Sequence, residues 1–203
     1  MTFLDKLKQD PGCLYIYNWG PYVYGLSKEP TEYIIIVTDN HPDFKDEYVI
    51  KQDNVFYQIY KIKDWFNKVL LGSIDCWECA CLNKKYIIKE HVKLMMTTNP
   101  LQLRKEIDSE LLGNPSELLS KEELVNYYWR IIRHCKFANQ IIDNHKITNF
   151  NEANSDYLTL SDTDNIEECY NNLISKSYKY LKQKTDELLR KDKIEKFLKK
   201  KDE

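Results

Sequence analysis

The segments WGPYVYG (residues 19–25) and TEYIIIV (residues 31–37) decide which fold this chain can adopt. The first segment is bounded by Gly20 and Gly25, and glycine accepts the backbone angles of tight turns, so we expect a turn followed by the start of a short helix. The second segment is a run of β-branched residues, which is typical of a strand buried on both faces. The carboxylate of Glu32 therefore stands at the start of a buried strand, close in sequence to a glycine turn.

The rest of the first hundred residues carries strand and helix patterns. Alternating or continuous β-rich runs predict strands, and Asp64 is a suitable N-cap for a helix that ends at Gly72. The short apolar segment 74–82, which contains Glu78, fits either a strand or a helical turn. We expect a first helix at 1–8 and strands at 13–17, 33–38, 47–51 and 55–60.

After about Pro100 the sequence changes character, and the remainder is predicted to be helical. The segment 121–144 has apolar residues at spacings of three and four, which predicts an amphipathic helix. A second helix is expected at 166–193, after a polar segment, 149–164, that we interpret as a long loop. The predicted organisation is an α/β core over residues 1–100, a helical region over 101–190 and a charged tail over 191–203 that is expected to fray.

The composition is that of an ordinary globular protein, with 31% charged and 42% hydrophobic residues. The net charge of −2 argues against nucleic-acid binding through the overall field of the protein, although a local basic face remains compatible with it. The N-terminus lacks the apolar core of a signal peptide. No apolar run approaches the roughly 20 residues that span a bilayer. We therefore expect a cytoplasmic protein with reduced cysteines and no membrane partner.

Two clusters of residues each allow a functional and a structural interpretation. Cys76, Cys79 and Cys81 provide one Cys-x2-Cys pair, whereas a zinc site needs two, so buried thiols are the favoured interpretation. Arg130 and Arg133 lie three residues apart on the helix 121–144, with Lys136 three residues further and Lys121 at the helix start. These cations could contact a triphosphate or a nucleic-acid backbone, or they could form a solvated helix face.

The order of the glycine turn and the acidic strand resembles the signature of the DNA polymerase beta-like nucleotidyltransferases, in which Gly-Ser begins a helix and Asp-x-Asp lies on the next strand. Pro21 stands where that family has Ser, and Glu32 and Ile34 stand where it has the two Asp residues. Looser blocks, among them 56–60 and Ser120-Lys121, extend the resemblance over most of the chain and are similar to a phage-type branch of predicted nucleotidyltransferases. The abundance of Lys, Asn, Ile and Tyr is also typical of the AT-rich genomes of many phages.

The resemblance implies an α+β fold with a small mixed sheet, and a site that binds a nucleoside triphosphate with Mg²⁺. Clustered carboxylates would hold two metal ions against the phosphates. The implied residues are Glu32 and Asp53 as catalytic groups, Glu32, Asp53 and Glu78 as metal ligands, and Gly20, Tyr22, Gly25, Lys121, Arg130 and Arg133 around the nucleotide.

The departures from the signature leave two main hypotheses, and a third in which the chain is an α/β domain whose resemblance to the family is accidental. Ile34 cannot bind a metal, and Pro21 has lost both a hydroxyl and a backbone N–H. The first hypothesis is a diverged nucleotidyltransferase that moves a nucleoside monophosphate to a hydroxyl or protein acceptor. The second is a catalytically inactive relative that binds a nucleotide, a nucleic acid or, if it is phage-encoded, a host protein in the host cytoplasm.

Overall fold

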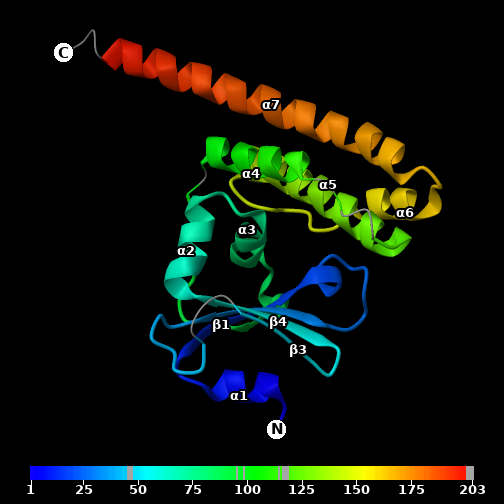
Figure 1. Ribbon diagram of the computed structural model, residues 1–203. Helices are drawn as coiled ribbons and strands as arrows, with labels where there is room; N and C mark the ends of the chain where they lie inside the picture. The colour runs from blue at the N-terminus through cyan, green and yellow to red at the C-terminus, as the bar shows by residue number, and fades with distance from the viewer. Residues whose placement is uncertain (45–47, 95, 98, 114, 116–118, 200–203) are drawn as a thin grey trace. The chain divides into compact units, whose positions relative to one another are not determined.

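The chain folds into two compact units, Met1–Thr97 and Thr98–Glu203, each described by itself (Figure 1). The structure is a computed structural model. It describes residues 1–44, 48–94, 96–97, 99–113, 115 and 119–199.

The first unit is built on a mixed sheet. Its described residues form five strands in the order β3-β4-β2-β1-β5. The strands β2 and β4 run parallel, and the other neighbouring pairs are antiparallel. The sheet and the helices confirm the predicted α+β fold class. The strands are β1 (Cys13–Trp19), β2 (Glu32–Val37), β3 (Tyr48–Gln52), β4 (Val55–Lys61) and β5 (Ile87–Lys89).

Both faces of the sheet are covered, so β2 is buried on both faces, as its sequence predicts. One face packs against α1 (Phe3–Gln9), where Ile35 and Ile59 of the sheet join Leu7 in a common apolar cluster. The opposite face carries α2 (Ile62–Leu70) and α3 (Ile74–Cys81), and Figure 1 shows these two helices across the sheet from α1. Because side chains alternate along a strand, Glu32 points to the side of α2 and α3.

Most predicted elements of this unit are confirmed, with small corrections. The predicted strand 47–51 is confirmed from Tyr48 onward, since Glu47 lies outside the described residues. The segment 74–82 is a helix, which resolves the open alternative. Asp64 is not the N-cap: α2 begins at Ile62 directly after β4, so Asp64 lies in the first turn of the helix. The helix expected after Gly20 is reduced to one 3-10 turn, η1 (Gly20–Tyr22).

The second unit is helical and centres on α5 (Lys121–Asn144), which packs against α4 (Pro100–Leu112), α6 (Asn154–Asp162) and α7 (Ile166–Lys199). The predicted helix 121–144 is confirmed at both ends. The hydroxyl of Ser120 accepts from the backbone N–H of Glu123, whose carboxylate accepts in return from Ser120. His145 closes the helix in the left-handed conformation.

Two helices of this unit depart from the sequence prediction. The segment 149–164 was predicted to be a long loop, and this prediction is wrong because the segment contains α6. The indole of Trp129 donates a hydrogen bond of 2.8 Å to the carbonyl of Ala153, and Leu160 is buried. Tertiary packing thus stabilises a helix that the polar sequence does not indicate. The helix α7 continues to Lys199, beyond the predicted end at residue 193, and residues 200–203 of the charged tail lie outside the described residues.

Within the part of the chain that the structure describes, no helix has the combination of length and apolar character needed to cross a bilayer.

Candidate functional site

A cavity of about 240 Å³ lies in the first unit, beside the ends of β1, β2 and β4. Trp19 pairs with Glu32 across β1 and β2, and Glu32 pairs with Phe56 across β2 and β4. Residues that are paired on neighbouring strands point to the same face, so an indole, a carboxylate and a phenyl ring form one row. The lining residues are Trp19, Glu32, Tyr33, Val49, Phe56 and Gln58.

Gly20 is in close contact with the carboxylate of Glu32. Its φ angle is +71°, and a Cβ atom at this position would lie 2.3 Å from Oε2 of Glu32. The positive φ angle favours glycine at this position, and a side chain there would have to displace the Glu32 carboxylate. The glycine turn and the start of the acidic strand are therefore in direct contact.

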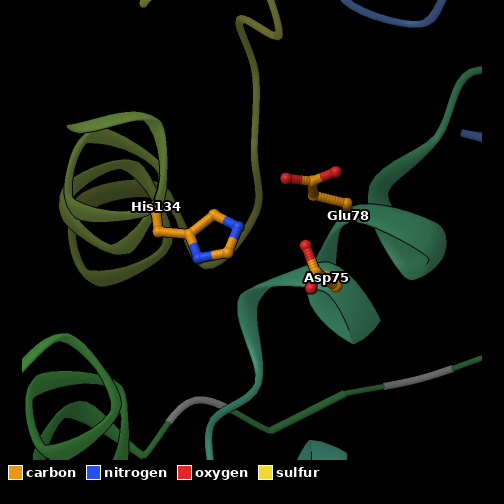
Figure 2. A group of neighbouring side chains, drawn as sticks. All are labelled: Asp75, Glu78 and His134. Carbon is orange, nitrogen blue, oxygen red and sulfur yellow. The ribbon is translucent and has the colours of Figure 1, made fainter. Parts of the chain in front are cut away.

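Behind the cavity wall, Glu78 fixes the orientation of Trp19. Glu78 is fully buried on α3, and its Oε2 accepts a hydrogen bond of 3.0 Å from Nε1 of Trp19 and another from the hydroxyl of Tyr24. Bonds to a buried carboxylate are strong compared with neutral ones. Figure 2 shows Glu78 about one helical turn after Asp75, both projecting from α3. The Glu78 carboxylate thus holds the edge of an indole that lines the cavity.

The three carboxylates implied as metal ligands do not converge. Asp53 lies in the tight turn between β3 and β4, with a φ angle of +52°. Its side chain is exposed at the end of that hairpin. Among the described residues, Glu32 lines the cavity without Asp53 or Glu78. These residues do not fit a two-metal centre, and no metal-dependent step is derived from them.

The remaining residues of the first unit that were predicted to contact a nucleotide lie outside the cavity lining. Tyr22 packs edge-on against Tyr86, with ring centroids 5.5 Å apart. Gly25 has a φ angle of +77° and is exposed in the turn. Of the predicted residues in this unit, the structure therefore brings Gly20 and Glu32 together.

In the second unit, the basic residues of α5 are engaged by neighbouring side chains. Arg133 is buried and lies over the ring of Trp129, with its guanidinium carbon 4.9 Å from the ring centroid. Arg130 forms an ion pair of 3.2 Å with Glu110 of α4, and Lys136 forms one with Asp156 of α6. Arg130 and Lys136 thus link α5 to α4 and α6, and Arg133 is buried within the unit. Arg133 and Lys136 therefore do not form the solvated face that was one alternative for these cations.

His134, the third residue labelled in Figure 2, belongs to α5 and completes this network within the helical unit. A guanidinium N–H of Arg133 donates to Nε2 of His134 over 3.1 Å. An arginine can only donate, so Nδ1 of His134 carries a proton and donates to Glu110 over 2.8 Å. Burial tends to raise the pKa of Glu110, but His134 and Arg130 outweigh it and lower that pKa.

Lys121 is separated from the two arginines along α5. It lies at the helix start, about 13 Å along the axis from Arg130 at the usual rise per residue. There it lines a second cavity of about 290 Å³ together with Glu122, Val125, Tyr157 and Ser161. The predicted cationic set of Lys121, Arg130 and Arg133 therefore does not converge on one anion.

The six cysteines are free thiols, and Cys76 and Cys79 are buried on α3. Burial raises the pKa of Cys79 well above its ordinary value, so its thiol stays protonated. The interpretation of this cluster as buried thiols is confirmed for Cys76 and Cys79, and Cys81 is half-buried.

Sequence reasoning missed Trp19, Phe56 and Gln58 as lining residues. Trp19 ends the strand before the glycine turn, and the alternation of β4 places Phe56 and Gln58 on one face. The alternation alone does not show that this face also carries Glu32, because that depends on the register between β2 and β4.

Comparisons with models of known protein families, with curated proteins and with solved structures found no match for this chain. The resemblance to nucleotidyltransferases therefore remains a prediction from the sequence.

Proposed function

We propose that the first unit binds a nucleotide by its base in the cavity beside Glu32, without catalysing nucleotidyl transfer. The observation that carries this proposal is the lining of the cavity, in which Trp19 and Phe56 flank Glu32. Aromatic side chains stack on the flat face of a base, and a carboxylate and an amide bind its polar edge. A small, mostly apolar hollow with few polar groups is the usual form of such a site.

A cation near the cavity favours a nucleotide, which carries a phosphate, over a free base as the ligand. Lys51 of β3 is paired with Phe56 of β4, and its ammonium nitrogen lies 5.0 Å from the centroid of the Phe56 ring. An ammonium group at this edge can bind the phosphate of a nucleotide whose base lies against the ring.

The catalytic alternative is a diverged transferase that uses Mg²⁺ and moves a nucleoside monophosphate to a hydroxyl or a protein. It requires Glu32 and Asp53 to hold metal ions around the same triphosphate. Their separation between the cavity and the hairpin turn favours binding without transfer.

Calorimetric titration with GTP and ATP, in Mg²⁺ and again in EDTA, tests the proposal. We expect binding of at least one nucleotide that persists in EDTA, together with quenching of tryptophan fluorescence that is lost in Trp19→Phe. Incubation with labelled nucleotide and candidate acceptors should give no transferred label. Strict dependence on Mg²⁺, or a labelled product, would establish the catalytic alternative. A lack of binding to any nucleotide would reject both.

A further inference from the structure

The second cavity lies within the helical unit, where α6 packs against the N-terminal part of α5. On α5, Lys121 and Val125 are four residues apart and share one face of the helix. Glu122 lies three residues before Val125, on the same side. On α6, Tyr157 and Ser161 are also four residues apart and share a face. The cavity of about 290 Å³ is therefore a groove between two helix faces.

The two ends of this groove differ in chemistry. At the start of α5, the exposed side chains of Lys121 and Glu122 place opposite charges at neighbouring positions. Further along the helix, Val125 is buried, and Trp129 follows it by one turn. The ring of Trp129 packs edge-on against Tyr157 of α6, with ring centroids 5.3 Å apart. The groove thus runs from a pair of opposite charges to an aromatic contact between the helices.

The interior of the groove offers apolar surface rather than hydrogen-bond donors. The hydroxyl of Ser161 donates a hydrogen bond of 2.8 Å to the carbonyl of Tyr157, so its proton is already used. The side chain of Val125 and the ring of Tyr157 favour an apolar group between them. The volume is at the lower end of the range of ligand pockets, which fits a small molecule.

We infer that this groove binds a free α-amino acid with an apolar or aromatic side chain, a function beyond the nucleotide binding proposed for the first unit. Such a ligand carries a carboxylate and an ammonium group on one carbon atom. Lys121 is matched to the carboxylate and Glu122 to the ammonium group, while the side chain lies between Val125 and Tyr157. From Lys121 to Val125 the helix rises about 6 Å, which is comparable with the reach of a leucine or phenylalanine side chain.

The neighbouring opposite charges disfavour other small ligands. A carboxylic acid without an amino group would meet the like charge of Glu122, and an amine without a carboxylate would meet that of Lys121. A triphosphate, which the resemblance implies for Lys121, is disfavoured by Glu122 for the same reason. Within a peptide, the amino and carboxyl groups of a residue are joined in uncharged amides. The groove therefore distinguishes a free amino acid from a peptide and from a polyanion.

Calorimetric titration of the full chain with L-phenylalanine and two analogues tests the inference. We expect L-phenylalanine to bind with a dissociation constant of about 1 mM, as for a ligand of this size. Hydrocinnamate lacks the ammonium group, and phenethylamine lacks the carboxylate. Each should bind about threefold or more weakly, because ion pairs at exposed positions contribute modestly. The absence of measurable binding, or equal affinities for the three ligands, would overturn the inference.

The exposed charges allow variants that should not disturb folding, which circular dichroism checks. In Lys121→Met, L-phenylalanine should bind no more tightly than phenethylamine, and in Glu122→Gln no more tightly than hydrocinnamate. The control, Lys146→Met, removes an exposed charge beyond the C-terminal end of α5 and should leave all three affinities unchanged. Equal losses in Lys146→Met and Lys121→Met would show that overall charge, rather than the groove, attracts the ligand, and would overturn the inference.

NMR spectra locate the ligand and separate this site from the proposed nucleotide site. L-Phenylalanine should shift the methyl signals of Val125 and the ring signals of Tyr157, and leave the ring signals of Phe56 unchanged. Shifts at Phe56 alone would place the amino acid in the first cavity and contradict the inference. The dipeptide phenylalanyl-glycine should bind as weakly as phenethylamine. Tighter binding of the dipeptide than of L-phenylalanine would exclude a free amino acid as the selected ligand.

Discussion

The two units of this protein place polar side chains in different surroundings. In the helical unit, Glu110 and His134 bind each other, and both also bind arginines of α5. In the sheet unit, Glu32 and Gln58 line a cavity between aromatic side chains. The paired charges of the helical unit therefore stabilise the packing of helices, whereas Glu32 and Gln58 line a cavity. For this reason we place the proposed nucleotide binding in the sheet unit.

The largest effect that we expect comes from removing Glu110 in the helical unit. Glu110→Ala removes the carboxylate that accepts from Nδ1 of His134 and pairs with Arg130. We expect a cost of about 3 kcal/mol, the upper end of the range for a buried donor that loses its acceptor, because the acceptor is charged. Hydrogen exchange of the α5 amides should show this loss of protection. Asp186→Ala, which removes the more exposed partner of Arg104, is the control and should cost about 1 kcal/mol or less. Equal effects of the two variants would show that the buried network does not stabilise this unit.

The next effect concerns the support of Trp19 in the sheet unit. Glu78→Ala removes the carboxylate that accepts from the half-buried indole of Trp19 and from the buried hydroxyl of Tyr24, which should cost about 1–3 kcal/mol of stability. We also expect weaker nucleotide binding, because the indole is no longer fixed. Thermal unfolding and calorimetry measure the two effects, and Tyr24→Phe, which removes one donor, should give a smaller change in both. Nucleotide affinity that is unchanged in Glu78→Ala would exclude a positioning role for Glu78.

Two glycine substitutions separate backbone strain from contact with Glu32. Gly20→Ala and Gly25→Ala both introduce a side chain at positive φ, at a cost of about 1–2 kcal/mol. Only the Cβ at position 20 would meet the carboxylate of Glu32, so we expect loss of nucleotide binding in Gly20→Ala alone. Circular dichroism confirms folding, and calorimetry measures the affinity. Similar affinities in the two variants would remove Glu32 from the site.

The stability of the helical unit should depend on pH through the carboxylate of Glu110. The pKa of Glu110 is lower in the folded state than in the unfolded state. Ionised Glu110 therefore contributes its full stabilisation above the unfolded-state pKa, and this stabilisation is lost as the pH falls through the folded-state pKa. We expect the protection of the α5 amides to decline below about pH 4.5, the region where a free glutamate titrates. The variant Glu110→Gln should reduce this dependence. A native chain whose α5 protection is constant down to pH 3 would contradict the lowered pKa.

The smallest effect is expected at the rim of the cavity. Lys51→Met retains the aliphatic length of the side chain and removes the charge near Phe56. The affinity for a nucleoside monophosphate should fall by about threefold, as for an exposed ion pair, and the affinity for the corresponding nucleoside should not change. Calorimetry at low and physiological salt measures both. Equal losses of affinity for the nucleotide and the nucleoside would show that Lys51 does not bind the phosphate.

The sequence predictions were accurate where an element is stabilised by residues close in sequence, and they failed where it depends on residues far apart in sequence. The helix 121–144 was predicted at both ends because the Ser120 capping box lies in its own sequence. The helix α6 was missed because its stability depends on contacts with Trp129, 24 residues from Ala153. The segment 74–82 was ambiguous because short apolar runs fit a strand or a helix equally well.

The candidate site was predicted in part for the same reason. The pairing of Gly20 with Glu32 could be expected, since the turn and the strand are close in sequence. Asp53 and the basic residues of α5 were grouped with them by resemblance alone. The structure places Asp53 in the hairpin turn and gives Arg130 and Arg133 partners within their own unit.

By itself, the sequence determined the buried strand, the glycine turn before it and the long amphipathic helix, because these follow from local backbone preferences and hydrophobic periodicity. Only the tertiary structure decided which side chains surround Glu32. The parallel register of β2 against β4 sets that arrangement, and a shift by one residue would turn Phe56 and Gln58 to the opposite face of the sheet.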